Sequence, residues 1–575
     1  MAEYNFNTNS WSRSPLMEKL YAEKETGRKL QEHKHIDWND NYELYRNKVK
    51  TNRLTQRQAV NIPLMKETIK TLLARIDDAP NVEWKELSGD EQKELIYQEV
   101  WNQQFKDNNM ELIDILDKKN VLLNGFSIKK LNIGDSGIDI SVLDAYDIFI
   151  DPLTNPWDLE SARFITHQNI FRSIREILAD DRYTGEGKEQ LKMWADSAPG
   201  LSQNQKNKED WEKKMERIKA MGVGHSEFAL YAGGDRLVNL TEHFYSQWDV
   251  HKNKFIRRVC VYADDHIELY NETLDNCIGV DFWPFVYWSE DPELGDVYPD
   301  SVADLVRTPN KVLNVWFSQL IENRTLKNFQ MHWFMPTQGY TPTTYTPGPG
   351  MMLPAPPGGD DINKVIKPVE ISGLDDTLEA ISALTNIVER GTGATAIEKG
   401  QGEQGTQTLG EIQILVGKAN ERATGMAKFY RLSWYELAWK WDKLMHANKP
   451  KFLKLFKQGQ SGKLYPKRVY AGDWVSQTGY EPMVRSTSEQ ETETTKSLQK
   501  FQFVMSQFPT NVALRKIAQK RELEALDLTP EELRQVEEAE EQAMQQASTP
   551  MMAQPTPEET QLGQELQQQV GQLTA

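Results

Sequence analysis

Cysteine, long apolar runs and excess positive charge are all scarce in this chain, and each scarcity excludes a class of protein. Cys260 and Cys277 are the only two cysteines in 575 residues, too few for a disulfide framework or a cysteine-based zinc site, so buried reduced thiols are expected. No apolar run approaches the ~20 residues that a membrane span needs, and the mean hydropathy is −0.65. Residues 1–15 lack the basic region and apolar core of a secretory signal, which predicts a protein made in a cytoplasm.

The charge balance is acidic. There are 67 lysines and arginines against 85 aspartates and glutamates, a net charge of −18. Tight wrapping of nucleic acid needs cations on phosphates, so this balance argues against it, but it is compatible with transient contact to moving DNA. A hydrophobic content of 39% and a length of 575 residues predict several modules with ordinary cores.

The stretch from Asp300 to Asn448 predicts a helix, an excursion and a second helix. Apolar residues recur at three- and four-residue steps from Ser301 to Phe329, which predicts a helix that Pro309 either kinks or ends after a first turn. Repeated proline and glycine exclude a helix between Met335 and Pro368. A second periodic run, from Leu374 to Gly391, predicts the returning helix.

A glycine-rich loop and one long helix follow. Residues 391–408 carry several glycines, no apolar stripe and one basic residue, Lys399. Helical periodicity resumes at Leu409 and lasts to about Ala447, roughly 60 Å at ~1.5 Å per residue. Aromatic residues at helical spacing on this helix predict core or subunit contacts rather than base stacking. They are Phe429, Tyr430, Trp434, Tyr435, Trp439 and Trp441.

The first 300 residues mix helical and extended patterns. Helices are expected over Pro15–Glu32, in much of Asp37–Ile76 and over Asp90–Asn124. An antiparallel sheet is expected from Leu237 to Trp288, and the charged stretch Asp180–Gly224 predicts an exposed helical insertion. The apolar residues expected to form the core face of Asp90–Asn124 are Leu95, Val100, Trp101, Phe105, Leu112, Ile113, Leu116 and Leu123.

Short strands and turns complete the expected pattern. FSIKKLNI and IDISVLDA, separated by GDSG, predict a β-hairpin. Near the C-terminus, RVYAGDWV and YEPMVRS predict strands, and the Glu-, Gln-, Met- and Pro-rich tail beyond Ala547 predicts a mobile, low-complexity segment.

This order of elements resembles the portal (head-to-tail connector) proteins of tailed bacteriophages. Order and spacing, rather than one motif, carry the resemblance over most of residues 40–450. The similar segments are RQAVNIPLMKETIKTLLARI (57–76), the helix at 113–122 with NGFSIKKLNI (124–133), SVLDAYDIFIDPLTNPWDLESARFI (141–165), RTPNKVLNVWFSQLIENRTLKN (307–328) and TLGEIQILVGKANER (408–422).

The resemblance implies an α+β portal-protein fold with an α/β wing, a two-helix stem, a small clip, a long wing helix and a helical C-terminal crown. The implied boundaries are 1–300 for the N-terminal region and α/β wing, 301–329 for the first stem helix, 330–368 for the clip, 369–390 for the second stem helix, 391–407 for the tunnel loop, 408–448 for the long wing helix, 449–505 for the C-terminal part of the wing, and 506–575 for the crown and mobile tail.

The resemblance also implies a function. A ring of identical copies, expected to be a dodecamer, would form a channel at one capsid vertex through which double-stranded DNA is packaged and ejected. The implied partners are the terminase large subunit, the major capsid and scaffolding proteins, and head-completion or tail adaptor proteins. The implied location is the virion, with the host cytoplasm during assembly. No catalytic residue, cofactor, metal or membrane span is expected.

Two groups of residues are candidates for contacts. A flexible glycine-rich loop could adjust around a DNA rod, although an exposed hinge without DNA contact explains it too. The clip is too short to bury its own apolar side chains, so these are expected to dock on neighbouring copies, terminase or a tail adaptor, or else to back onto the stem helices. The channel candidates are Lys399, Glu398, Gln401, Glu403 and Gln404, and the clip candidates are Tyr340, Tyr345, Met351, Met352 and Leu353.

Other functions have weaker support. Asp264, Asp265, His266 and Glu268 suggest a metal-dependent nuclease, but adjacent carboxylates on a strand point to opposite faces, and a turn between two strands explains them. GTGATAIEKG lacks the lysine and the preceding strand of a phosphate-binding loop. A capsid adaptor or scaffold that forms no ring is the remaining alternative, and light scattering would distinguish it from a ring.

Overall fold

The computed structural model describes residues 4–5, 10–11, 13–48, 60–76, 80–134, 137–197, 231–232, 235–328, 332–334, 366–370, 376–393, 409–450, 452–458 and 464–485. The chain divides into two compact units, Met1–Ser486 and Thr487–Ala575, and every described residue belongs to the first. The expected crown and C-terminal tail, 506–575, lie outside the described residues.

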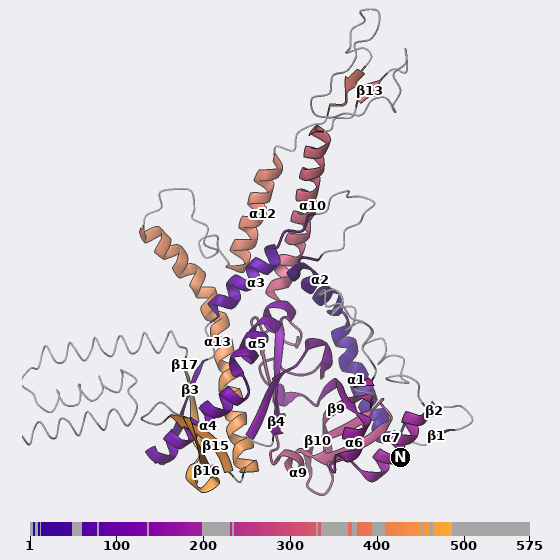
Figure 1. Cartoon of the computed structure of the whole chain (residues 1–575), viewed down its shortest axis with the longest axis vertical. Coiled ribbons are helices and arrows are strands. Elements are labelled where there is room, and N and C mark those ends of the chain that lie inside the picture. The colour runs from indigo at the N-terminus through magenta and orange to yellow at the C-terminus, as the bar shows by residue number, and fades with distance from the viewer. Residues whose placement is uncertain are drawn as a thin grey trace, which may run out of the picture. The chain divides into compact units, whose positions relative to one another are not determined.

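The described helices include those that the periodic patterns predicted (Figure 1). They are α1 Pro15–Glu32, α2 His35–Tyr45, α3 Leu64–Arg75, α4 Glu91–Asp107, α5 Met110–Asn124, α6 Ile174–Ala179, α7 Gly185–Ser197, α9 Leu274–Ile278, α10 Val302–Asn328, α12 Asp376–Thr392, α13 Leu409–Asn448 and α14 Ala471–Trp474, with short 3₁₀ turns η1 Ala145–Asp147 and η2 Leu159–Ser161. Of the two alternatives at Pro309, a kink or the end of a first turn, the second is wrong, because α10 continues through this residue.

A six-stranded antiparallel sheet forms the larger β layer. Its strand order is β11-β10-β9-β7-β6, with β8 paired to β9. The alternating aromatic and β-branched residues that predicted a sheet after Leu237 supply β9, β10 and β11. The strands are β6 Ile148–Ile150, β7 Phe164–Ser173, β8 Tyr231–Ala232, β9 Asp235–Asp249, β10 Lys254–Ala263 and β11 Ile267–Thr273.

A second sheet, of order β12-β4-β5, corrects one expectation. β12 (Phe285–Ser289) does not join the larger sheet; it pairs with β4 (Phe126–Gly134), which forms the predicted hairpin with β5 (Gly137–Val142). All five residues of β12 are buried, so its apolar run did not show which sheet it would join. The remaining pairs are β1 Tyr4–Asn5 with β2 Ser10–Trp11, β3 Asn81–Glu86 with β17 Tyr480–Arg485, β13 His332–Phe334 with β14 Ile366–Pro368, and β15 Phe452–Gln458 with β16 Leu464–Tyr470.

The run Asp90–Asn124 is helical, as expected, but it forms two helices, because Asn109 adopts a left-handed conformation (φ 51°) between them. Three local expectations are wrong. Within this run, Leu95, Leu112 and Leu116 are exposed instead of forming a core face. The charged insertion is not fully exposed, because its helix α7 buries Leu191 and Trp194 against the larger sheet. The residues AGDW, expected to belong to a strand, form the helix α14.

The main core lies around the C-terminal half of α13. Trp434, Leu437 and Trp441 are buried there, with Trp441 4.9 Å from Trp101 and 5.7 Å from Trp84 between ring centres. The aromatic stripe of α13 therefore splits: Tyr430, Trp434 and Trp441 form core, whereas Phe429, Tyr435 and Trp439 remain exposed. The side chains of residues 409–424 lie outside the described residues.

Gly125 forms the turn between α5 and β4, and it lies against the segment that leads into α10. It ends α5 in a left-handed conformation with φ 87°. A Cβ atom there would lie 2.0 Å from the carbonyl oxygen of Pro299, so any larger residue would displace the segment that leads into α10.

Candidate functional site: the α10–α12 helix pair

The N-terminus of α10 is tightly capped. Ser301 and Asp304 cap each other: the Asp304 amide donates to Ser301 Oγ (3.2 Å) and the Ser301 amide donates to Asp304 Oδ2 (2.7 Å). The Val302 amide donates to Glu290 Oε1 at 2.7 Å. Burial raises the pKa of Glu290 to about 8, with the nearby carboxylates of Asp291 and Asp304 adding to the shift. A largely protonated carboxyl group thus lies where α10 begins.

Ion pairs join this end of α10 to α2. Arg307 lies 2.5 Å from Asp304 on its own helix and 3.1 Å from Asp37 on α2. Lys34, which precedes α2, lies 2.6 Å from Asp300. Contacts from two sides therefore hold the base of α10 in one orientation.

A polar stripe along α10 binds residues 60–65, which lead into the first turn of α3. Asn310, Asn314 and Ser318 are buried at four-residue intervals, so their side chains lie on one face of the helix. They bond backbone groups that have no partner within the chain's own local structure, including the Met65 amide in the first turn of α3. Asn310 accepts from the Met65 amide (2.9 Å) and donates to the Ile62 carbonyl (3.0 Å), Asn314 accepts from the Ile62 amide (2.7 Å), and Ser318 accepts from the Val60 amide (3.1 Å).

α12 packs beside α10 (Figure 1). The chain leaves along α10 and returns along α12, because β13 and β14, which follow and precede these helices, pair with each other. Val388 of α12 is buried, and Ile381 and Leu384 pack partly buried against the main core. α12 ends at Thr392, one residue beyond the expected end at Gly391, because the following Gly393 adopts a left-handed conformation with φ 77°.

Both helices keep apolar side chains exposed. On α10 they are Leu305, Val315 and Leu326, and on α12 they are Leu378 and Ile387. A pair of helices with apolar residues on both its inner and outer faces has surface left for a further partner.

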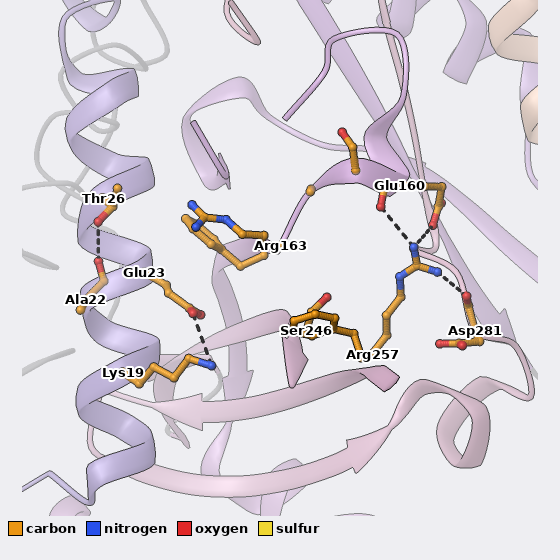
Figure 2. Close-up of a pocket in the computed structure, with 13 residues that line it drawn as sticks. Lys19, Ala22, Glu23, Thr26, Glu160, Arg163, Ser246, Arg257 and Asp281 are labelled. Carbon is orange, nitrogen blue, oxygen red and sulfur yellow. Dashed lines mark hydrogen bonds and ion pairs between the residues drawn. The ribbon is translucent and has the colours of Figure 1, made fainter. Parts of the chain in front are cut away.

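An open pocket of about 840 Å³ lies elsewhere, between α1, the η2–β7 segment and the β9–β10 pair (Figure 2). Its three cationic side chains each have a carboxylate partner: Lys19 lies 3.7 Å from Glu23, Arg257 3.0 Å from Glu160, and Arg163 2.6 Å from the buried Asp151. Burial would raise the pKa of Asp151, but the hydrogen bonds from Arg163 outweigh burial and lower it. These charges neutralise one another, which suits a structural role better than anion binding.

The comparisons with known proteins assign the family. The model of the family described as phage SU10 portal protein matches residues 30–461, well over half of the chain. The chain belongs to this portal family. The match includes α10, α12 and α13, and it confirms the portal function that the sequence resemblance implied.

No curated protein matches the chain. Two solved structures of gene transfer agent (GTA) particles are similar to this portal protein, each with a TM-score of 0.34 and each alignment covering 80% of this chain and 90% of the other. They are described as the virion of a native GTA particle (11% identity) and the neck of an empty GTA particle computed with C6 symmetry (12% identity).

The residues predicted to contact DNA or partners in this portal protein are not among those described. The channel candidates Glu398, Lys399, Gln401, Glu403 and Gln404 lie outside the described residues, and so do the clip candidates Tyr340, Tyr345, Met351, Met352 and Leu353. What the structure adds is the polar stripe of α10, which sequence reasoning missed. Its signal, Asn-x-x-x-Asn-x-x-x-Ser within an apolar helix, is visible in the sequence.

The Asp264–Glu268 cluster forms the predicted turn. Asp264 and Asp265 adopt left-handed conformations (φ 50° and 61°) between β10 and β11. Lys24 Nζ donates to Asp265 (3.0 Å), and Trp194 Nε1 donates to Asp264 (3.1 Å), so the two carboxylates point toward different helices. Among the described residues, no three side chains of metal-ligand type come together, and no helix could cross a membrane.

Proposed function

We propose that this portal protein forms a closed ring whose channel carries double-stranded DNA at one capsid vertex. In each copy, α10 and α12 form the stem, residues 330–368 the clip, 391–407 the tunnel loop, α13 the long wing helix and 506–575 the crown. Twelve copies are proposed, as the sequence resemblance implies. The observation that carries this proposal is the paired stem: two helices joined through an excursion, anchored at the α10 base and apolar on their outer faces.

The proposed mechanism is geometric rather than catalytic. A cyclic ring uses the same side-to-side contact in every copy and closes when the rotation between copies is a whole fraction of a turn. Exposed apolar residues of the stem, such as Leu378 and Ile387, would be buried between copies. The net charge of −18 per copy gives the ring few cationic sites on which a passing duplex could lodge.

The channel and clip candidates keep their proposed roles. The loop containing Lys399 would contact the duplex weakly, and the clip residues around Tyr345 and Met352 would dock the terminase large subunit and, later, head-completion or tail adaptor proteins. Major capsid and scaffolding proteins would contact the wing. The protein would reside at the portal vertex of the virion, and in the host cytoplasm during assembly. We propose no enzymatic step.

Electron microscopy of the purified full chain tests the ring. We expect annular particles with a central hole, and class averages that show twelve repeats. Monomers under all conditions, or a compact oligomer without a hole, would contradict the proposal.

A double variant tests whether the stem helices of neighbouring copies contact each other. Replacing Leu378 and Ile387 together by Asp should shift the mass measured by light scattering toward monomer, because the charges would be buried between copies. Leu294→Asp with Val250→Asp, at two highly exposed apolar positions outside the stem helices, is the matched control and should leave the rings intact.

A further inference from the structure

The N-terminal half of helix α5 buries charged side chains and exposes apolar ones, the reverse of an ordinary surface helix. Its charged residues Asp114, Asp117 and Lys118 are buried. Three apolar residues of its N-terminal half are exposed instead, and their spacing places them on one face, whereas Val121, Leu122 and Leu123 further along the helix are buried. The exposed residues are Leu112 (57% exposed), Ile115 (48%) and Leu116 (45%), and we call this set the α5 outer face.

The buried charges hold α5 in this orientation. Lys118 lies 2.7 Å from Asp114, and Lys129 of β4 lies 2.6 Å from Asp117. Trp288 Nε1 of β12 donates to Asp117 at 2.8 Å. Rotating α5 to bury the leucines would strip these charges of their partners, so the outward leucines are a built feature of the fold.

Helix α13 has a second exposed apolar stripe. Phe429, Leu432, Tyr435 and Trp439 follow one another at steps of three, three and four residues, and each is more than a third exposed. We call this set the α13 outer face. The opposite side of the same helix carries the buried residues Tyr430, Trp434, Leu437 and Trp441.

The two outer faces cannot cover each other within one chain. The buried sides of the two helices meet, because the ammonium of Lys118 lies 4.9 Å from the ring centre of Tyr430. The α5 outer face and the α13 outer face therefore point away from that contact. A closed ring requires this kind of arrangement, since each copy must offer two different and complementary surfaces to its two neighbours.

The two faces also complement each other in shape and charge. A recess of about 520 Å³ at the α4–α5 corner, lined by Phe105, Met110 and Leu112 among others, adjoins the α5 outer face and can take an aromatic ring. Glu111 is exposed one turn before Ile115, and Lys428 is exposed one turn before Leu432. Contact between the faces would thus bring together aliphatic and aromatic side chains with opposite charges at the rim.

We propose that the α5 outer face of one copy packs against the α13 outer face of the next copy in the portal ring. This inference rests on the proposed ring and names the surfaces that close it. It takes a second copy of this chain as the partner.

Cysteine crosslinking tests the contact directly. In a Cys277→Ser background, the pair Leu112→Cys and Leu432→Cys, treated with a short bis-maleimide, should produce a ladder of covalent multimers on denaturing gels, up to the full ring. Each single variant should give no ladder, because its partner cysteine is missing. Leu112→Cys with Leu294→Cys, at a highly exposed loop position, is the matched control pair and should give none either.

A second set of variants measures how the α5 outer face affects ring formation. Leu112→Asp with Leu116→Asp should reduce ring formation at least tenfold at equal concentration while leaving the thermal unfolding temperature of the monomer unchanged, because both positions are exposed. Glu186→Gln, at an exposed position on α7 outside both faces, should assemble like the parent. Intact rings without a crosslinked ladder would overturn this interface and leave the portal proposal standing, whereas an unmodified chain that never forms rings would overturn the portal proposal itself.

Discussion

Glu290 is a carboxyl group buried at the base of the stem, and its environment makes a prediction at the scale of one residue. Its folded pKa of about 8 lies above the ordinary value of 4.5, so the folded state holds a proton that the unfolded state releases. This contribution to stability is complete below pH 4.5 and is lost as pH rises toward 8. Between these values we expect the free energy of unfolding to fall by about 1.4 kcal/mol per pH unit from this group.

Glu290→Gln separates this slope from other titrations. An amide resembles the protonated carboxyl and keeps an acceptor for the Val302 amide, so the variant should unfold with a flatter pH dependence than the parent. Urea denaturation at pH 5, 6, 7 and 8 measures the difference. Parallel pH curves for the parent and the variant would show that Glu290 is ionised in the folded protein.

Asp117 makes a second residue-scale prediction. Asp117→Asn would leave Lys129 buried without its charge partner, which costs about 3–5 kcal/mol. We expect denaturant unfolding to show this loss, with a lower midpoint and an unchanged slope. Glu111→Gln, exposed on the same helix, should change stability by less than about 0.5 kcal/mol. A midpoint unchanged by Asp117→Asn would mean that water reaches Lys129 freely.

At the scale of the element, the polar stripe of α10 binds residues 60–65 through hydrogen bonds. Asn310→Ala would leave the Met65 amide and the Ile62 carbonyl without partners, at about 1–3 kcal/mol for each buried group. We expect lower stability and faster amide hydrogen exchange at Ile62 and Met65. Gln319→Ala, on the exposed side of α10, is the matched control. Equal exchange rates in both variants would show that other contacts hold the segment.

At the scale of the whole molecule, the hydrophobic clusters of the described residues all lie within the first compact unit, between Met17 and Tyr480. A chain ending at Ser486 should therefore fold, and its thermal midpoint should stay within about 4 °C of the full chain, a shift that corresponds to roughly 4 kcal/mol for a unit of this size at ~2.1 cal/mol/K per residue. Circular dichroism measures this. Loss of a cooperative transition would mean that residues beyond Ser486 complete the core.

Sequence periodicity was sufficient to predict the two helices α10 and α12 and the long helix α13. α10, α12 and α13 each combine an apolar period of three to four residues with clear flanks of proline or glycine, and each begins or ends within two or three residues of its expected limits. The turn at Asp264–Asp265 was predictable for a related reason, since two polar residues separate two apolar strands. Local signals of this kind need no knowledge of distant contacts.

The amino-acid sequence by itself determined the order of these elements, and with it the portal family. Tertiary structure alone decided which side of each element faces inward. Leu112 and Leu116 looked like core and are exposed, while Asp117 is buried, because it is paired with Lys129 of the following strand and with Trp288, 171 residues away in the chain. β12 joined β4 rather than the larger sheet for the same reason: a fully buried strand has no polar face to mark its neighbour. Which side chains are buried and which strands pair depends on contacts with other elements, and a local sequence pattern carries no information about those contacts.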